Sequence, residues 1–368
     1  MRGSPPAESS DAAGRIAASS DLASADRSFS DRARSARERL GRVVAVGEVG
    51  VLLALALIVI FFYALEPAFL SPRNIRAILR VVSFIGIIAI GQTVLLVGGE
   101  FDLSVGAVAG LSAVCSAKLM TAFALPVGIA LFGGVVVGAS VGLVNGLVVV
   151  KLKIPAFIQT LGMLFIGQGL IQVVTNGYPV YPLPAAIADI GYADFIFGLG
   201  WSFVFFVIAA LVADFVLRRT VLGRNMYATG GNPEVARLVG IDTTRYKIGA
   251  FMLIGTLAAI AGMFVMADLA SGTTSIGSGW ELSVIAGVVV GGVSLFGGAG
   301  TIAGGLSGVL LLQVVTSGLV VVGVNANWQQ IAVGVIMVLA VGLDIVRRRY
   351  FIAGGGSTSE ATGETQQP

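Results

Sequence analysis

The chain of 368 residues is 56% hydrophobic and 12% charged, carries a formal net charge of +3, and has a mean hydropathy of +0.94. Because a soluble domain is typically about 25% charged, this composition excludes an ordinary soluble protein and predicts an all-α polytopic membrane protein. The small charge gives no support for nucleic acid as a partner. With no histidine and only one cysteine, Cys115, the chain has little material for a catalytic triad, a zinc site or a disulfide framework.

Residues 1–47 are rich in Ser, Ala, Arg and acidic residues, which predicts a disordered tail, and residues 347–368 form a second polar tail. Between the tails, apolar runs of membrane-spanning length recur and predict about ten transmembrane helices. The predicted spans are 48–65, 79–98, 104–123, 126–150, 155–174, 195–217, 247–269, 281–296, 301–322 and 329–346.

The basic residues predict the orientation of these spans. With a cytoplasmic N-terminus, most Lys and Arg residues fall on the cytoplasmic side, as the positive-inside rule requires, and the C-terminus is cytoplasmic too. The exceptions on the outer side are Arg73, Arg76, Arg80 and Lys118.

Two carboxylates interrupt the apolar pattern in the stretch LLVGGEFDLSVGAVAGL, residues 95–111. A charged side chain at a helix centre costs about 2.5–3.5 kcal/mol on insertion scales, so Glu100 and Asp102 are not expected to face lipid. We expect the Gly98–Gly99 pair to break the helix and Asp102 to cap the next one. The stretch is either a short aqueous loop or a polar break that lines a path through the protein.

A related pattern recurs later in the chain. The stretch DLSVGAVAGLSAV begins at Asp102, and ELSVIAGVVVGGV begins at Glu281. Five predicted spans separate the two stretches, so they would have opposite orientations, which indicates a possible inverted 5+5 repeat of the kind found in transporters.

Glycines at four-residue spacing predict close helix packing, because small residues let membrane helices approach each other. They are Gly134, Gly138, Gly142 and Gly146 in one run, and Gly300, Gly304 and Gly308 in another.

The polar segment 218–247 is rich in basic residues and is predicted to lie in the cytoplasm. Asn232 can cap a helix, Pro233 suits its first position, Glu234 complements its positive end, and Gly240 can terminate it, so we expect a short helix over 233–239. The segment is either an ordinary surface loop or a docking element for a cytoplasmic partner.

Five ordered motifs resemble the permease subunit of bacterial ABC importers for simple sugars, of the ribose/xylose/galactose type. They are GGEFDLSVG, NGLVVVKLKIPAFIQTLGML, GRNMYATGGNPEVARLVGI, ELSVIAGVVVGGVSLFGGAGTIAGG and WQQIAVGVIMVLAV, and the resemblance covers residues 50–346. It implies the ABC importer permease fold in the bacterial inner membrane, with 48–346 as the transmembrane domain. It also implies a second permease copy, cytoplasmic ATPase subunits and an extracytoplasmic sugar-binding protein, and neither a catalytic residue nor a cofactor in this chain. No phosphate-binding loop motif occurs, since no lysine follows a glycine, so ATP would be bound by the separate ATPase chain.

The resemblance also implies which residues couple the permease to its ATPase. Glu234, Ala236 and Gly240 fit an E-x-A-x-x-x-G coupling motif, although Val235 replaces an alanine that the family commonly has, and Glu100 and the long N-terminal tail also depart from the common pattern. The predicted coupling residues are Gly223, Arg224, Gly230, Gly231, Asn232, Glu234, Ala236 and Gly240.

Polar residues in apolar surroundings are the candidates for the substrate path, because amides, hydroxyls and carboxylates suit a hydroxyl-rich substrate. They are Gln92, Glu100, Asp102, Ser104, Asn145, Gln159, Thr160, Asn176 and Glu281, with Gln168 as a further candidate. No metal site is predicted.

The alternative function is an autonomous ion-coupled secondary sugar transporter. Such a protein needs carboxylates for its coupling ion, and Glu100, Asp102, Asp268 and Glu281 are available. A membrane enzyme is a third interpretation, but the chain offers it few nucleophiles or metal ligands.

Overall fold

A computed structural model describes residues 50–191, residues 198–325 and, with gaps at 326–327, 330, 333, 337 and 340–341, the helical residues up to 342. These residues belong to one unit that begins at Gly50. The predicted tails 1–47 and 347–368 lie outside the described residues, as does the end of the last predicted span.

The described part of the chain is largely helical, and its long helices coincide with predicted spans. The helix at 72–97 begins seven residues before the span predicted from 79, and the helix at 201–219 begins six residues after the span predicted from 195. Six of them are long and apolar enough to cross a membrane: α2 (Pro72–Val97), α4 (Val127–Lys151), α5 (Ala156–Thr175), α7 (Trp201–Arg219), α10 (Thr243–Leu269) and α12 (Ile302–Val321). Shorter apolar helices are Gly50–Leu65, α3 (Val105–Thr121) and α11 (Trp280–Val290). The remaining short helices are η1 (Pro67–Leu70), α6 (Ala185–Gly191), α8 (Val221–Gly231) and α9 (Pro233–Leu238).

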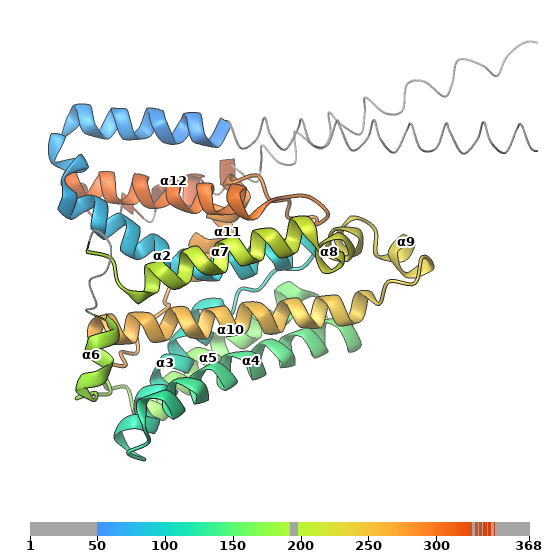
Figure 1. The fold of residues 1–368 in the computed structure, drawn as a ribbon, viewed down its shortest axis with the longest axis horizontal. Helices are drawn as coiled ribbons and strands as arrows, with labels where there is room; N and C mark the ends of the chain where they lie inside the picture. Colours follow the sequence, from blue (N-terminus) through green and yellow to red (C-terminus); the bar gives the residue numbers. More distant parts are fainter. Residues whose placement is uncertain are drawn as a thin grey trace, which may run out of the picture. The chain divides into compact units, whose positions relative to one another are not determined.

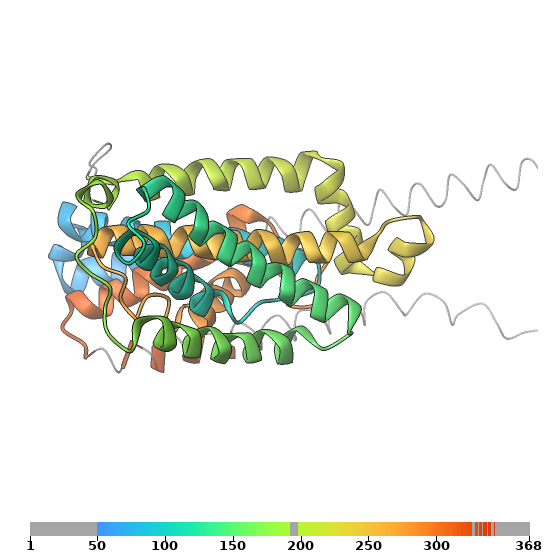
Figure 2. The same ribbon diagram turned by 90° about the horizontal axis from the view of Figure 1, so that it is seen from below.

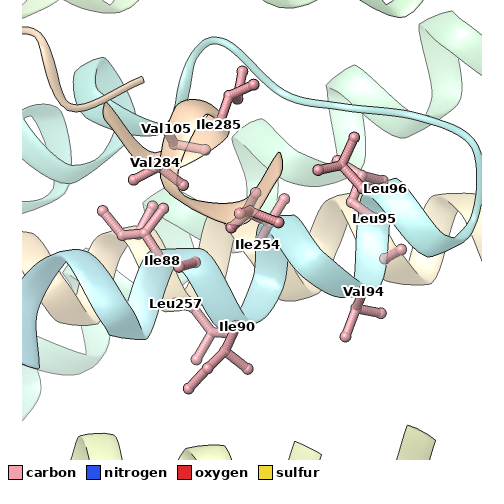
Figure 3. Close-up of a cluster of buried hydrophobic side chains, with 14 of the residues drawn as sticks. Ile88, Ile90, Val94, Leu95, Leu96, Val105, Ile254, Leu257, Val284 and Ile285 are labelled. Atoms are coloured by element: carbon pink, nitrogen blue, oxygen red, sulfur yellow. The ribbon is translucent and has the colours of Figure 1, made fainter. Parts of the chain in front are cut away.

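The interior of the unit is built around α2, most of which is buried. Ile88, Ile90 and Val94 of α2 belong to one apolar cluster with Leu257 of α10 and Val284 of α11 (Figure 3). In contrast, α4, α5 and α7 leave most of their apolar side chains at least partly exposed, as expected for helices that face lipid or other membrane subunits.

The predicted glycine packing is confirmed between α4 and α10, which lie side by side (Figures 1 and 2). A Cβ on Gly138 would collide with the backbone oxygen of Gly255, and one on Gly142 would collide with that of Phe251. Gly308 of α12 meets the backbone of Gly287 of α11 in the same way. Without side chains at these positions the backbones reach a distance that favours van der Waals contact.

The predicted span 281–296 is too long. The apolar run 281–296 was expected to be a single helix, but α11 ends at Val290 and a non-helical segment, residues 291–301, follows it. Gly292, Gly297 and Gly298 in this segment have left-handed backbone angles (φ 88°, 85° and 73°), which valine and leucine tolerate poorly. The glycines therefore end the helix despite the apolar composition.

Two other non-helical segments lie next to α3. Residues 98–104 connect α2 to α3, and residues 270–279 connect α10 to α11. The latter runs along α3: Gly277 contacts the backbone of Gly106, and Gly272 lies against Ala117. Each of the two similar sequence stretches, from Asp102 and from Glu281, therefore stands at the start of a short helix that follows a non-helical segment.

Candidate functional site

A buried cluster of polar side chains surrounds the predicted break in the membrane region. The backbone N–H and the hydroxyl of Ser104 both donate hydrogen bonds to Asp102 Oδ1, each at 2.6 Å. Asn145 Nδ2 of α4 donates to Asp102 Oδ2 at 3.2 Å and to Ser104 Oγ at 3.0 Å, and Gln159 Nε2 of α5 donates to Asn145 Oδ1 at 3.1 Å. We call these four residues the Asp102 cluster; they connect the 98–104 segment to α4 and α5.

The predicted capping role of Asp102 is wrong. The N-cap of α3 is Ser104, and no side-chain hydrogen bond caps this helix. Asp102 stands two residues before the cap, and a bond to the backbone two residues on is a local arrangement that aspartate favours in turns. Its carboxylate is only 1% exposed, so three donors replace the water that it loses. The expected helix break is confirmed: α2 ends at Val97, and Gly99 has a left-handed φ of 81°.

The other carboxylate of the break is part of an ion pair. Lys247 Nζ, near the start of α10, lies 2.6 Å from Glu100 Oε1, and the two side chains are 16% and 17% exposed. Because few water molecules reach the pair, its attraction is screened less than that of a surface pair. It fixes the 98–104 segment to the helix that directly follows α9.

Three glycine pairs meet where α2 ends, and we call this contact the glycine junction: 98–99, 230–231 and 297–298. A Cβ on Gly230 would collide with the Val97 carbonyl oxygen, and one on Gly297 would lie 2.6 Å from the Gly230 oxygen. The Gly298 N–H donates to the Val97 oxygen at 2.9 Å. The junction therefore joins α8 to both the 98–104 and the 291–301 segments through backbone contacts.

Tyr227 of α8 strengthens the same connection, since its hydroxyl donates to the Gly300 carbonyl oxygen at 2.6 Å.

The short helix predicted over 233–239 is confirmed as α9. The Asn232 side chain accepts from the N–H groups of Glu234 (3.0 Å) and Val235 (3.1 Å), and Pro233 occupies the first turn. Gly240, with a φ of 85°, follows the helix end. Figures 1 and 2 show α9 beyond the ends of α8 and α10.

The surface of α9 is unusually apolar for an exposed turn. Val235, Leu238 and Val239 are 54%, 86% and 71% exposed, whereas Ala236 is buried. Apolar side chains that gather at an exposed tip mark an interaction surface.

The sequence of the chain matches a known protein family over most of its length. The family described as "Branched-chain amino acid transport system / permease component" matches residues 74–341, which include α9, the glycine junction and the Asp102 cluster. The chain belongs to this permease family.

Curated relatives of the permease are named as ABC transporter permeases or import permeases. The L-arabinose ABC transporter permease protein AraH of Azospirillum brasilense is 38% identical over 283 residues, which cover 77% of this chain and 83% of the relative. The ribose import permease protein RbsC of Bacillus subtilis is 36% identical over 303 residues (81% and 92%). The autoinducer 2 import system permease protein LsrC of Salmonella typhi is 33% identical over 293 residues (79% and 83%). No solved structure matches the chain.

These relatives confirm the predicted resemblance to sugar ABC importer permeases of the ribose type. The permease is thus a transport subunit and not an enzyme, and its apolar helices make it a multi-pass membrane protein.

The other predicted path residues of the permease lie apart from the Asp102 cluster or bond locally. Gln92 of α2 is fully buried, and its amide has no hydrogen-bond partner among the described residues. Thr160 donates to the Ala156 oxygen of its own helix at 2.7 Å. Asn176 is an exposed residue that ends α5, and Glu281 lies half-buried in the first turn of α11.

The remaining predicted coupling residues lie on α8. Gly223 is buried, and a Cβ there would collide with the backbone of Leu217, whereas Arg224 is exposed. The sequence did not predict three contacts of this region: Lys247 with Glu100, Tyr227 with Gly300, and the 297–298 glycine pair with Gly230. The sequence does show Lys247 in a basic segment and the glycines in pairs, but no sequence pattern identifies the residues that they contact.

The part of the permease that the structure describes contains no group of three or more Cys, Asp or Glu side chains that could hold a metal ion.

Proposed function

We propose that this chain is the membrane-spanning permease subunit of an ATP-driven ABC importer. In this proposal it moves a monosaccharide or a similar small hydroxylated compound across the inner membrane. The observation that carries the proposal is the contact of α8, directly before the exposed helix α9, with both non-helical segments at the glycine junction.

The choice of a sugar-like substrate is supported by the relatives. The names of two of them specify L-arabinose and ribose, while the family description mentions branched-chain amino acids. We give the relatives more weight, because they are 36–38% identical to this chain over about four fifths of its length.

The proposed topology has ten membrane spans in an inverted 5+5 repeat, with both termini in the cytoplasm. The shorter helices α3 and α11 would each complete a span together with the non-helical segment beside them. This agrees with the requirement that irregular backbone at membrane depth be enclosed by protein or water.

The proposed partners are a second permease copy, cytoplasmic ABC ATPase subunits and an extracytoplasmic sugar-binding protein. The exposed apolar tip of α9 supports an ATPase contact, and the largely exposed faces of α4, α5 and α7 leave room for a second copy as well as for lipid.

The geometry supports a mechanism of alternating access. When the ATPases close, they displace α9, and α8 moves with it because only Asn232 separates the two helices. The glycine junction transmits the displacement of α8 to the end of α2 and to the 291–301 segment. If α10 is displaced as well, the Glu100–Lys247 pair transmits its displacement to the 98–104 segment. The non-helical segments 98–104 and 291–301 would then shift together, so that the substrate path closes on one side of the membrane and opens on the other.

The alternative, an autonomous secondary transporter, is less well supported by the same side chains. Of the four carboxylates available for a coupling ion, all but Glu281 have side-chain partners among the described residues: Glu100 pairs with Lys247, and Asp268 lies 3.0 Å from Arg80. Asp102 is enclosed by hydrogen-bond donors, which leaves little space for a cation.

The test is reconstitution in vesicles. The permease assembled with its ATPase and binding protein should take up radiolabelled sugar only when ATP is supplied. The permease alone should take up none, even under an imposed proton or sodium gradient. Gradient-driven uptake by the isolated chain would overturn the ABC proposal in favour of the secondary transporter.

A further inference from the structure

A second polar region of the permease lies outside the Asp102 cluster. An open cavity of about 450 Å³ is lined by the start of α3, the second half of α5 and the non-helical residues 274–278. Its polar lining comes from Gln168 and Gln172 of α5 and from Thr274 and Ser278 of the non-helical segment.

The two glutamines occupy an unusual position for a membrane helix. Gln168 and Gln172 are one turn apart, and both are exposed on α5, which is long and apolar enough to span a membrane. Gln168 lies about two turns before the helix end at Thr175, within the apolar layer if α5 spans it. An unpaired amide in an apolar medium costs roughly 2–7 kcal/mol, so this face of α5 is expected to meet water, a polar ligand or polar groups of a second permease copy instead of lipid.

The backbone opposite the glutamines also has a specific shape. The segment before α11 lies against α3 because Gly277, with a φ of 82°, contacts Gly106. A Cβ at Gly106 would collide with the Gly277 oxygen, so only glycine lets the segment approach this closely. That approach brings Thr274 and Ser278 to the same cavity as the glutamines.

The lining determines which class of ligand fits. None of the described residues that line the cavity is charged, which disfavours an ion or a zwitterionic amino acid as its ligand. The carboxylate of Glu281 lies against Gly106, one of the lining residues. Amides and hydroxyls can each donate and accept hydrogen bonds, and this suits a neutral ligand with several hydroxyl groups. Phe165, one turn before Gln168, adds an apolar aromatic surface for the carbon face of a sugar ring. The volume lies within the range of about 300–1,000 Å³ that is usual for small-molecule sites.

We propose that this cavity, and not the buried Asp102 cluster, holds one monosaccharide in transit, with Gln168 and Gln172 bonding its hydroxyl groups. This inference rests on the proposed import function and adds the place and the residues at which the permease itself contacts the sugar. The Asp102 cluster then has a positioning role, since its side chains satisfy one another.

The first experiment measures sugar taken up per ATP hydrolysed by the complete importer in vesicles, with D-ribose, L-arabinose and D-galactose as probes. Both Gln168→Leu and Gln172→Leu should lower this ratio about five- to tenfold, the effect of losing one or two hydrogen bonds, while ATP hydrolysis stays normal. Since both side chains are exposed, the substitutions should leave folding unchanged. Val173→Leu is the matched control on the same helix, because Val173 is 73% exposed and does not line the cavity.

The second experiment tests occupancy directly in the assembled importer. In a Cys115→Ala background, a cysteine introduced by Gln168→Cys should react with a small hydrophilic thiol reagent more slowly when the transported sugar is present in excess. A cysteine introduced by Tyr178→Cys, in the exposed segment after α5, should react at the same rate with and without sugar.

The outcomes separate the two proposals. If the wild-type importer takes up none of the three sugars, the proposed sugar import fails and the cavity assignment fails with it. If it takes up sugar while both leucine variants keep the normal ratio, import stands and the cavity assignment is overturned. A Gln168→Cys thiol that is unreactive with and without sugar would show that protein fills the cavity, which also overturns the assignment.

Discussion

Glu100 and Asp102 are two positions apart, yet the protein compensates their charges by different means. The Glu100 carboxylate meets the Lys247 ammonium group, whereas the Asp102 carboxylate accepts hydrogen bonds from Ser104 and Asn145. A buried carboxylate that lost these partners would be strongly unfavourable. Both residues therefore tie the 98–104 segment to helices distant in sequence, and each connection can be tested by itself.

The first prediction concerns the amide that holds Asp102 to α4. Asn145→Leu keeps the side-chain size but removes a hydrogen-bond donor to a buried carboxylate, so it should lower the free energy of unfolding by about 1.5–3 kcal/mol. Denaturant titration of the purified permease in detergent measures this. The control is Val144→Ala on the neighbouring exposed position, which should change stability by less than about 0.5 kcal/mol. Equal stability of Asn145→Leu and wild type would show that Asp102 does not depend on α4.

The second prediction concerns the ion pair. Glu100→Lys and Lys247→Glu should each destabilise the permease by about 3–5 kcal/mol, because each leaves like charges together in a site that is only about one-sixth exposed. The double reversal should recover most of the loss, since it restores opposite charges. Thermal melting measures all three variants.

A more exposed ion pair on α7 provides the control for these charge reversals. Arg218 and Asp214 lie 2.7 Å apart on α7, but their side chains are 44% and 35% exposed. Arg218→Glu should therefore change the melting temperature far less than Lys247→Glu. A double reversal at 100 and 247 that is no more stable than either single variant would argue against a direct charge interaction.

At the scale of whole elements, the sequence predicts the presence of helices better than their ends. Apolar runs located the long helices, and the Asn-Pro-Glu stretch with Gly240 located α9, because these signals are local. The shortening of α11 was not predictable, since Gly291 and Gly292 in a valine-rich run resemble packing glycines elsewhere in the chain. The Glu100–Lys247 pair joins residues 147 positions apart, and no local pattern specifies such a contact.

The third prediction belongs to α9, whose end requires a left-handed residue at Gly240. Since no atom of the described residues lies within 4 Å of where its Cβ would be, a substitution acts through backbone strain and not through a clash. Gly240→Val should therefore displace the end of α9 and abolish most ATP-driven uptake, because a β-branched residue is poorly tolerated at positive φ. Gly240→Asn should retain most of it, because asparagine tolerates this conformation. Uptake by reconstituted vesicles compares the two, and equal activity would mean that the end of α9 is not part of the coupling route.

At the scale of the whole molecule, α8 contacts both the 98–104 segment and the 291–301 segment. The ends of α2 and of the 291–301 segment meet it at backbone positions, where glycine leaves no side chain to absorb a movement. Such contacts transmit displacement between rigid elements more directly than flexible side chains do. In the proposed mechanism, one displacement of α8 therefore shifts two segments that belong to opposite halves of the chain.

The fourth prediction tests this transmission with a substitution that preserves the fold. Tyr227→Phe removes the hydroxyl that donates to the Gly300 oxygen at 2.6 Å but keeps the aromatic ring. Because the loss of one hydrogen bond is worth about 0.5–1.5 kcal/mol, ATP-driven uptake should fall by up to about tenfold while the melting temperature changes little. Tyr178→Phe, at a residue that is 74% exposed, is the matched control and should transport normally. If Tyr227→Phe transports as well as wild type, the movement of α8 must reach the 291–301 segment through the glycine contacts alone.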